Sequence, residues 1–323
     1  MSVSERGRKL AVLTVALGAG SIVAAVALAA STPIAVKTTP RNEVGPSAGA
    51  DWLSWSKSRG RKTSPFDLFA QHAADPAFRV NPKGTQAYGG GIDGTRLLYQ
   101  LIRGRFATLS DLRLFDLQAR KLTKLPAGIN TKNWECCGTI SGDWILFSRG
   151  RAYSTARQLV LLRNLVTGEQ RVLDTLRNRN GLISAGQLNG NFAVWGRCNP
   201  YPQCTVFRYD LSTATATALP TIPDKVPYSP SVNPQGTVYY LRSIRGCGKS
   251  VELVKQRLVG LPEVVAALPQ GRDGEVTYAY TLPPDPSSPD VTTQVYFDTV
   301  VCRRQTWNIY RVDDVESVIP PQP

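Results

Sequence analysis

Arginine recurs in this chain in a pattern that suits the binding of anions. Arg-Gly-Arg triplets begin at Arg59, Arg103 and Arg149, each near the end of an apolar run. Guanidinium groups make bidentate hydrogen bonds with phosphate and carboxylate groups. We therefore predict one anion-binding face, with a solvated basic rim that has no dedicated ligand as the alternative. The predicted face contains Arg59, Arg61, Arg103, Arg105, Arg149, Arg151, Arg197, Arg242, Arg245, Arg303 and Arg304.

The six cysteines are an even number, which in an exported chain predicts disulfides. Cys198 and Cys204 flank a short loop and are expected to form one bond. Cys247 and Cys302 occupy equivalent loops of consecutive repeats and are expected to form a second. The adjacent pair Cys136-Cys137 leaves three alternatives: a strained vicinal disulfide, two thiols, or a bond to another chain.

The sequence contains no recognisable catalytic or metal-binding constellation. His72 is the only histidine and no Cys-x-x-Cys pair exists, which argues against a zinc site. Nucleophile-elbow, zinc-protease and phosphate-loop motifs are absent from the sequence. Asp93, Asp143 and Asp210 are expected at turns, where local hydrogen bonds account for them. We predict no catalytic residue, no metal and no cofactor.

An aromatic residue closes the first strand of a recurrent unit that consists of a turn, an apolar strand, a polar loop and a second strand. The period of this unit is typical of one four-stranded blade of a β-propeller. We predict an all-β chain that forms a six-bladed β-propeller of four-stranded blades over residues 50–319. The closing aromatics are Trp55, Tyr99, Phe147, Trp195, Tyr240 and Tyr280, which lie 44, 48, 48, 45 and 40 residues apart.

Two parts of the last repeat depart from this pattern. Residues 282–305 begin with a Pro-rich stretch and are predicted to be a long irregular insertion. The last repeat lacks a full outer strand and the first lacks an inner strand. We predict that the tail around Val315 to Ile319 pairs with the first blade and closes the ring, which leaves residues 320–323 as a free tail.

The N-terminus has the composition of a targeting segment. A basic head precedes an apolar run from Leu10 to Ala30, and Ala27-Leu28-Ala29 fits a cleavage site. Residues 1–29 are predicted to be a signal peptide or a signal anchor helix, and retention would attach the chain to a membrane through residues 10–30. Either outcome predicts a secreted or cell-envelope location. Residues 30–49, rich in Pro and Thr, are predicted to be a flexible linker.

Three short motifs carry a resemblance to a known family. They are the turn Asn233–Tyr240, the segment Gly91-Ile92-Asp93-Gly94, and the strands ending in Leu-Phe-Asp-Leu and Tyr-Asp-Leu. In these motifs the chain resembles TolB-type six-bladed propellers and their exported actinobacterial relatives over roughly residues 50–315. The resemblance implies a binding scaffold. It does not imply a role in a Tol system, because residues 30–50 offer no counterpart of the α/β domain of TolB.

These observations favour an exported, non-enzymatic binding protein. The formal charge of the chain is +14, and a field of that sign attracts anions. The expected partner is an anionic envelope polymer or an envelope protein, and nucleic acid is not expected outside the cytoplasm. One alternative is a propeller hydrolase or lyase with a carboxylate or metal site in its central channel. Another is a structural module that meets its partner through blade edges.

Overall fold

The computed structural model describes most of the chain beyond the predicted targeting segment. The described residues are 31–60, 65–103, 109–151, 154–178, 180–222, 225–243, 251–268, 272–283, 290–301 and 306–317. Side chains are not described at 151–156 and 272–277. The predicted signal or anchor segment 1–29 and the tail 320–323 lie outside these ranges. No helix within these ranges is long and apolar enough to cross a membrane.

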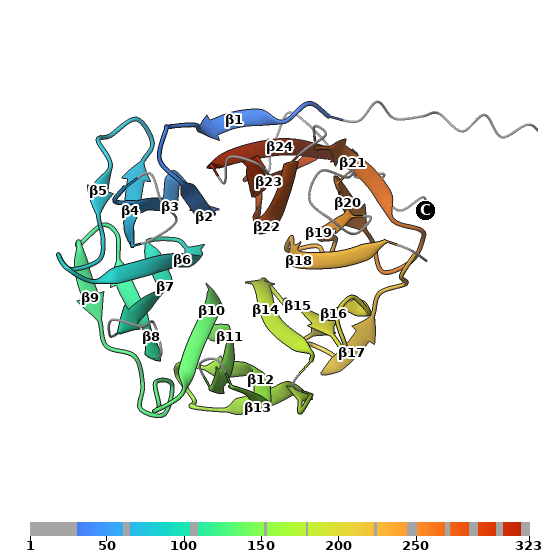
Figure 1. Ribbon diagram of the computed structural model, residues 1–323, viewed down its shortest axis with the longest axis horizontal. Helices are drawn as coiled ribbons and strands as arrows, with labels where there is room; N and C mark the ends of the chain where they lie inside the picture. Colours follow the sequence, from blue (N-terminus) through green and yellow to red (C-terminus); the bar gives the residue numbers. More distant parts are fainter. Residues whose placement is uncertain are drawn as a thin grey trace, which may run out of the picture.

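Antiparallel sheets are arranged around a central axis as a β-propeller (Figure 1). The first four-stranded sheet contains β2 (Glu43–Gly49), β3 (Trp52–Ser58), β4 (Phe66–His72) and β5 (Phe78–Arg79). An eight-stranded sheet follows, with β6 (Gln86–Asp93), β7 (Arg96–Arg103), β8 (Leu109–Asp116), β9 (Lys121–Thr123), β10 (Trp134–Ser141), β11 (Trp144–Arg151), β12 (Ser154–Asn164) and β13 (Gln170–Leu176).

Three more four-stranded sheets complete the ring. One contains β14 (Leu182–Asn189), β15 (Phe192–Cys198), β16 (Cys204–Asp210) and β17 (Thr215–Ala218). The next contains β18 (Val226–Val232), β19 (Val238–Ser243), β20 (Val251–Gln256) and β21 (Glu263–Ala267). The last combines β1 (Ile34–Lys37) with β22 (Arg272–Thr281), β23 (Asp290–Val301) and β24 (Trp307–Ser317).

The propeller fold is confirmed, but the predicted six four-stranded blades are not. Four blades are separate four-stranded sheets, and the remaining strands, β6 to β13, form one continuous eight-stranded sheet. These strands merge because β10 pairs in parallel with β8 through Trp134 and Ser110, and the Ser110 hydroxyl donates to the Glu135 carbonyl at 2.7 Å. β9 pairs only with Leu114 to Asp116 of β8, so the edge of β8 at Ser110 is available to pair with β10.

The N-terminal residues close the ring, which corrects two predictions. β1 pairs antiparallel with β24, Ile34 facing Arg311, and supplies the outer strand that the last repeat lacks. β2 supplies the missing inner strand of the first sheet. Residues 34–37 and 43–49 are therefore strands, and the predicted flexible linker is wrong for them. The predicted pairing of the tail with the first blade is also wrong for Val315 to Ser317, which pair with β23, and residues 318–319 lie outside the described residues.

The predicted irregular insertion contains a twelve-residue strand. Asp290–Val301 forms β23, which pairs with both β22 and β24. Threonine and glutamine at the start of this strand hide its alternation, and the preceding prolines suggest a loop. Because β23 is the second strand of its sheet, Tyr280 lies in the innermost strand, β22. The other five closing aromatics lie in second strands and are buried in the core; they are Trp55, Tyr99, Phe147, Trp195 and Tyr240.

Each innermost strand changes register near its middle, and this irregularity lets neighbouring innermost strands approach closely. The register shifts lie between Val44 and Ser47 in β2, and at the equivalent places in β6, β10, β14, β18 and β22. A Cβ on Gly90 would lie 2.3 Å from the Gly138 carbonyl oxygen of β10, so only glycine fits there. The inner strands surround the axis (Figure 1).

Candidate functional site

The arginines of the predicted face are held by carboxylates wherever their side chains are described. Each lies at the end of a second strand or just beyond it. The partners are Asp67 for Arg59 (2.8 Å), Asp111 for Arg103, Glu135 for Arg149 (2.9 Å), Asp174 for Arg197 (2.9 Å) and Glu252 for Arg242 (2.6 Å). Arg61, Arg105, Arg245, Arg303 and Arg304 lie outside the described residues, and the side chain of Arg151 is not described.

These ion pairs fasten the ends of the strands to one another. Arg149 also donates to the carbonyls of Gly128 and Ile129, at 3.0 and 2.7 Å. Burial raises the pKa of Asp67, but hydrogen bonds from Arg59 and Asn81 outweigh burial and hold this pKa below its ordinary value. The five arginines of the predicted face whose side chains are described therefore take part in ion pairs that stabilise the strand ends. Arg197 is one of these five, and it also borders a cavity.

The cavity that Arg197 borders has a volume of about 890 Å³ and lies between the β14–β17 sheet and β18. It opens on the end of the ring where second strands lead into third strands, which is the predicted anion face. The β15–β16 loop and the connection from β17 to β18 form its walls. The polar and aromatic side chains that line it are Arg197, Asn199, Gln203, Thr205, Phe207, Thr221 and Lys225.

A disulfide holds one wall of this cavity. Cys198 and Cys204, which face each other across β15 and β16, are bonded as predicted. Within the loop Gln203 N donates to Pro200 O at 2.8 Å, and Asn199 N donates to Gln203 O at 3.0 Å. The Asn199-Pro200 and Tyr201-Pro202 peptide bonds are cis. The loop thus presents its amide side chains from a fixed backbone.

Removing this disulfide is expected to lower the free energy of unfolding by about 2 kcal/mol. Cys198 and Cys204 are six positions apart, and a short closed loop restricts the unfolded chain less than a long one. Urea unfolding of a Cys198→Ser, Cys204→Ser double variant measures the loss, and amide exchange of Asn199, Tyr201 and Gln203 should quicken. An unchanged unfolding free energy would show that the loop is held by its hydrogen bonds alone.

Two cations line the cavity, and each is paired with a carboxylate that is not among the described lining residues. Arg197 binds Asp174, and Lys225 Nζ binds Glu252 Oε2 at 2.7 Å, yet none of the described lining residues is acidic. The side chains of Arg197 and Lys225 remain 32% and 28% exposed. Burial raises the pKa of Glu252, but hydrogen bonds from Lys225 and Arg242 outweigh it and lower this pKa. Both cations that line the cavity are therefore already held by a carboxylate.

Sequence reasoning found part of this site. It named Arg197 and the Cys198–Cys204 bond but missed Lys225, Asn199, Gln203 and Phe207. The connection between sheets that contains Lys225 ends on the same face as the disulfide loop. The position of Lys225 within the repeat could therefore have predicted that it lies on this face.

The central axis is filled where β14, β18 and β22 meet. Gln187 of β14 is 0% exposed and hydrogen-bonds to Ala279 N and O at 2.9 and 2.8 Å, and to Val232 N at 3.2 Å. Tyr278 OH donates across the axis to Ile92 O at 2.6 Å. Within the described residues no group of three His, Cys, Asp or Glu side chains could hold a metal ion. His72 is the last residue of β4, 3.4 Å from Asp75, and its ring lies 4.8 Å from that of Trp52 at a tilted angle.

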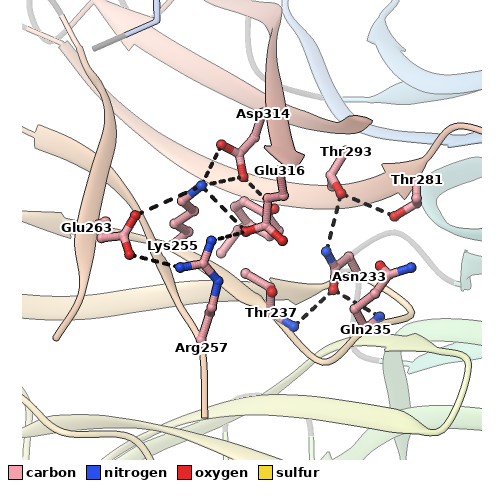
Figure 2. Close-up of polar contacts among 11 residues, drawn as sticks. Asn233, Gln235, Thr237, Lys255, Arg257, Glu263, Thr281, Thr293, Asp314 and Glu316 are labelled. Atoms are coloured by element: carbon pink, nitrogen blue, oxygen red, sulfur yellow. Dashed lines mark hydrogen bonds and ion pairs between the residues drawn. The ribbon is translucent and has the colours of Figure 1, made fainter. Parts of the chain in front are cut away.

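A buried charged cluster joins the β18–β21 sheet to the last sheet (Figure 2). Lys255 Nζ of β20 lies 2.8 Å from Asp314 Oδ1 and 3.4 Å from Glu316 Oε1 of β24. The Tyr239 hydroxyl donates to Asp314 Oδ2 at 2.8 Å. Burial, together with the Asp314 charge, raises the pKa of Tyr239. Because every member has a partner within the protein, this cluster acts as a connector rather than as a binding site.

Comparisons with known proteins show likeness in fold alone. No family model and no curated protein matches the chain. Among solved structures, the β-propeller domain of the Trilobed protease from Pyrococcus furiosus has a TM-score of 0.48 and 9% identity, over 88% of this chain and 96% of that one. An oligogalacturonate lyase in complex with manganese has a TM-score of 0.47 and 11% identity, over 86% and 84%.

A prolyl endopeptidase has a TM-score of 0.42 and 11% identity over 88% of this chain, which spans half the length of that enzyme. The resemblance to TolB-type propellers stays a resemblance, since no family model matches. At these identities the likeness concerns backbone architecture and says nothing of chemistry. The chain is thus similar in structure to solved β-propeller proteins.

Proposed function

We propose that this chain is a binding protein whose Arg197–Lys225 cavity takes an anionic group of a hydroxyl-rich polymer. The observation that carries this proposal is a cavity with two cations and no acidic group among its described lining residues. Arginine makes charge-assisted hydrogen bonds with carboxylate or phosphate. Asn199, Gln203 and Thr221 offer donors and acceptors to hydroxyls, and Phe207 offers an apolar surface.

An extracytoplasmic location belongs to the same proposal. The Cys198–Cys204 bond supports it, because structural disulfides persist in oxidising compartments. The sequence of residues 1–29 supports it independently.

Substituting the cavity cations is expected to weaken polymer binding by roughly tenfold each, since a hydrogen bond to a charged group contributes about 1.5 kcal/mol or more. The variants are Arg197→Gln and Lys225→Gln, titrated calorimetrically with a polyuronate, a polyphosphate and neutral dextran. Arg171→Gln is the matched control, since Arg171 pairs with Glu169 away from the cavity. It should bind the polyanions as the unsubstituted chain does, and added salt should weaken all polyanion binding.

Three outcomes would overturn this proposal. Equal weakening by Arg171→Gln would mean that net charge alone attracts the polymer. Unchanged binding by the Arg197→Gln, Lys225→Gln double variant, or no polymer binding at all, would point to a protein partner instead.

The alternative function is a hydrolase or lyase. Oligogalacturonate lyase and prolyl endopeptidase are enzymes with a similar fold, but that likeness does not extend to chemistry. Near the axis the side chains of Gln187 and Tyr278 hydrogen-bond inner strands to one another. Following the size of the polymer during each titration tests it directly, because depolymerisation would establish an enzyme.

A further inference from the structure

Two adjacent cysteines lie at the register shift of the innermost strand β10. The shift falls between Cys136 and Thr139, and Cys137 has a φ of 57°. This is the left-handed region, which residues with a side chain seldom adopt. The following residue must be glycine, because a Cβ on Gly138 would lie 2.9 Å from the side chains of Leu98 and Leu112. The surrounding structure therefore imposes this backbone conformation on the pair.

The bulge brings the two sulfur atoms together. Cys137 Sγ lies 2.8 Å from Cys136 Sγ, closer than two sulfur atoms that share no bond ordinarily approach. Both side chains are partly exposed, whereas Cys198 and Cys204 are buried. Cys137 packs against the core formed by Leu146, Val160 and Trp195, which limits its rotation. The two sulfurs therefore need only a small movement to bond.

A bond between neighbouring cysteines is expected to be readily reversible. Their Cα atoms are separated by about 3.8 Å across one peptide unit, below the usual disulfide range of about 4.4–6.8 Å. Such strain makes a disulfide easier to reduce, and strained or exposed disulfides are those that respond to redox conditions. The pair differs from the Cys198–Cys204 bond in exposure, because Cys136 and Cys137 are partly exposed residues whereas Cys198 and Cys204 are buried.

We propose that Cys136 and Cys137 are a redox-active dithiol that forms a reversible vicinal disulfide by exchange with a low-molecular-weight disulfide. Cys137 attacks one sulfur of the oxidant, which releases a first thiol and leaves a mixed disulfide. Cys136 then attacks Cys137 Sγ and displaces a second thiol. The pair loses two electrons and two protons, and the oxidant disulfide becomes two thiols. This modification site is independent of the proposed binding function.

The order of the two steps follows from the surroundings of Cys136. The hydrogen bond from Cys137, burial and the nearby Glu135 charge all raise the pKa of the Cys136 thiol well above its ordinary value. Thiolates, and not thiols, attack disulfides. Cys137 is therefore the sulfur that attacks first, and Cys136 is the one that resolves the mixed disulfide.

Peptide-level alkylation of the full chain tests the proposal. The chain is equilibrated in glutathione buffers of increasing oxidised fraction, quenched in acid, alkylated with N-ethylmaleimide and digested. The peptide that contains Cys136 and Cys137 should lose both labels together, two hydrogens lighter than the dithiol, and dithiothreitol should restore both. Cys198–Cys204 should remain bonded in buffers that still reduce the pair.

Single substitutions separate the two roles. Cys136→Ser should trap glutathione on Cys137, and neither Cys136→Ser nor Cys137→Ser should show the loss of two hydrogens that marks the bond between the pair. Near-ultraviolet circular dichroism checks that both variants fold. Retention of both labels in the most oxidising buffer would overturn the proposal. A wild-type glutathione adduct that never resolves, or a disulfide-linked dimer that needs these cysteines, would overturn it as well.

Discussion

Replacing Lys255 with methionine is expected to lower the free energy of unfolding by about 3–5 kcal/mol, because it leaves a buried negative charge without its partner. Lys255 is 9% exposed and Asp314 is 7% exposed. After the substitution, the Tyr239 hydroxyl remains beside Asp314 while the ammonium group is gone (Figure 2). Urea unfolding followed by circular dichroism measures the change.

Two further variants show whether burial is the reason. Arg257 binds the same Glu316 at 3.0 Å, but its side chain is 50% exposed, so Arg257→Met should cost no more than about 1 kcal/mol. A Lys255→Met, Asp314→Leu double variant should recover most of the loss, since removing both buried charges is often close to neutral. If Lys255→Met and Arg257→Met cost the same, the cluster is open to water in solution.

Replacing Gln187 with leucine is expected to lower the free energy of unfolding by about 4 kcal/mol. Leucine fills a similar volume but leaves Ala279 N and Val232 N without the acceptor that Gln187 provides, and Ala279 O without its 2.8 Å donor. A buried backbone group that loses its partner costs about 1–3 kcal/mol. Three inner strands meet at this one side chain, so the loss should also loosen the centre of the ring.

Asn189 supplies the matched control for Gln187. Its amide donates to the Val232 carbonyl and to the same Ala279 carbonyl, each at 3.2 Å, but it is partly exposed, so water can replace these bonds. Asn189→Leu should cost about 1 kcal/mol. Hydrogen exchange at the Ala279 and Val232 amides should quicken in Gln187→Leu alone. A loss below 1 kcal/mol in that variant would contradict the role assigned to Gln187.

The strand pattern and the disulfide loop could be predicted because both depend on residues close together in the chain. Alternation of apolar and polar residues marks a strand that faces a core, and the aromatics at the repeat period are buried as expected. Cys198 and Cys204 are near enough to bond whatever the rest of the chain does. Neither signal depends on which sheet edges meet.

The number of separate sheets could not be predicted, since hydrogen bonds between backbones carry no side-chain signature. Ser110 and Trp134 merge β8 with β10 through a single pairing. β1 lies within the predicted linker because its pairing comes from the open edge of β24 at the other end of the chain. β23 lies within the predicted insertion because the polar residues at its start hide its alternation.

The sequence by itself determined the all-β propeller class, the core aromatics and the Cys198–Cys204 bond, since local alternation and short separations specify them. The tertiary structure decided the chemistry of the arginines. Five of them meet carboxylates on neighbouring strands, and Arg197 and Lys225 meet at a cavity because two sheets lie side by side there. The strength of an interaction between two charges depends on the distance between them, and for residues far apart in the chain only the folded structure sets that distance.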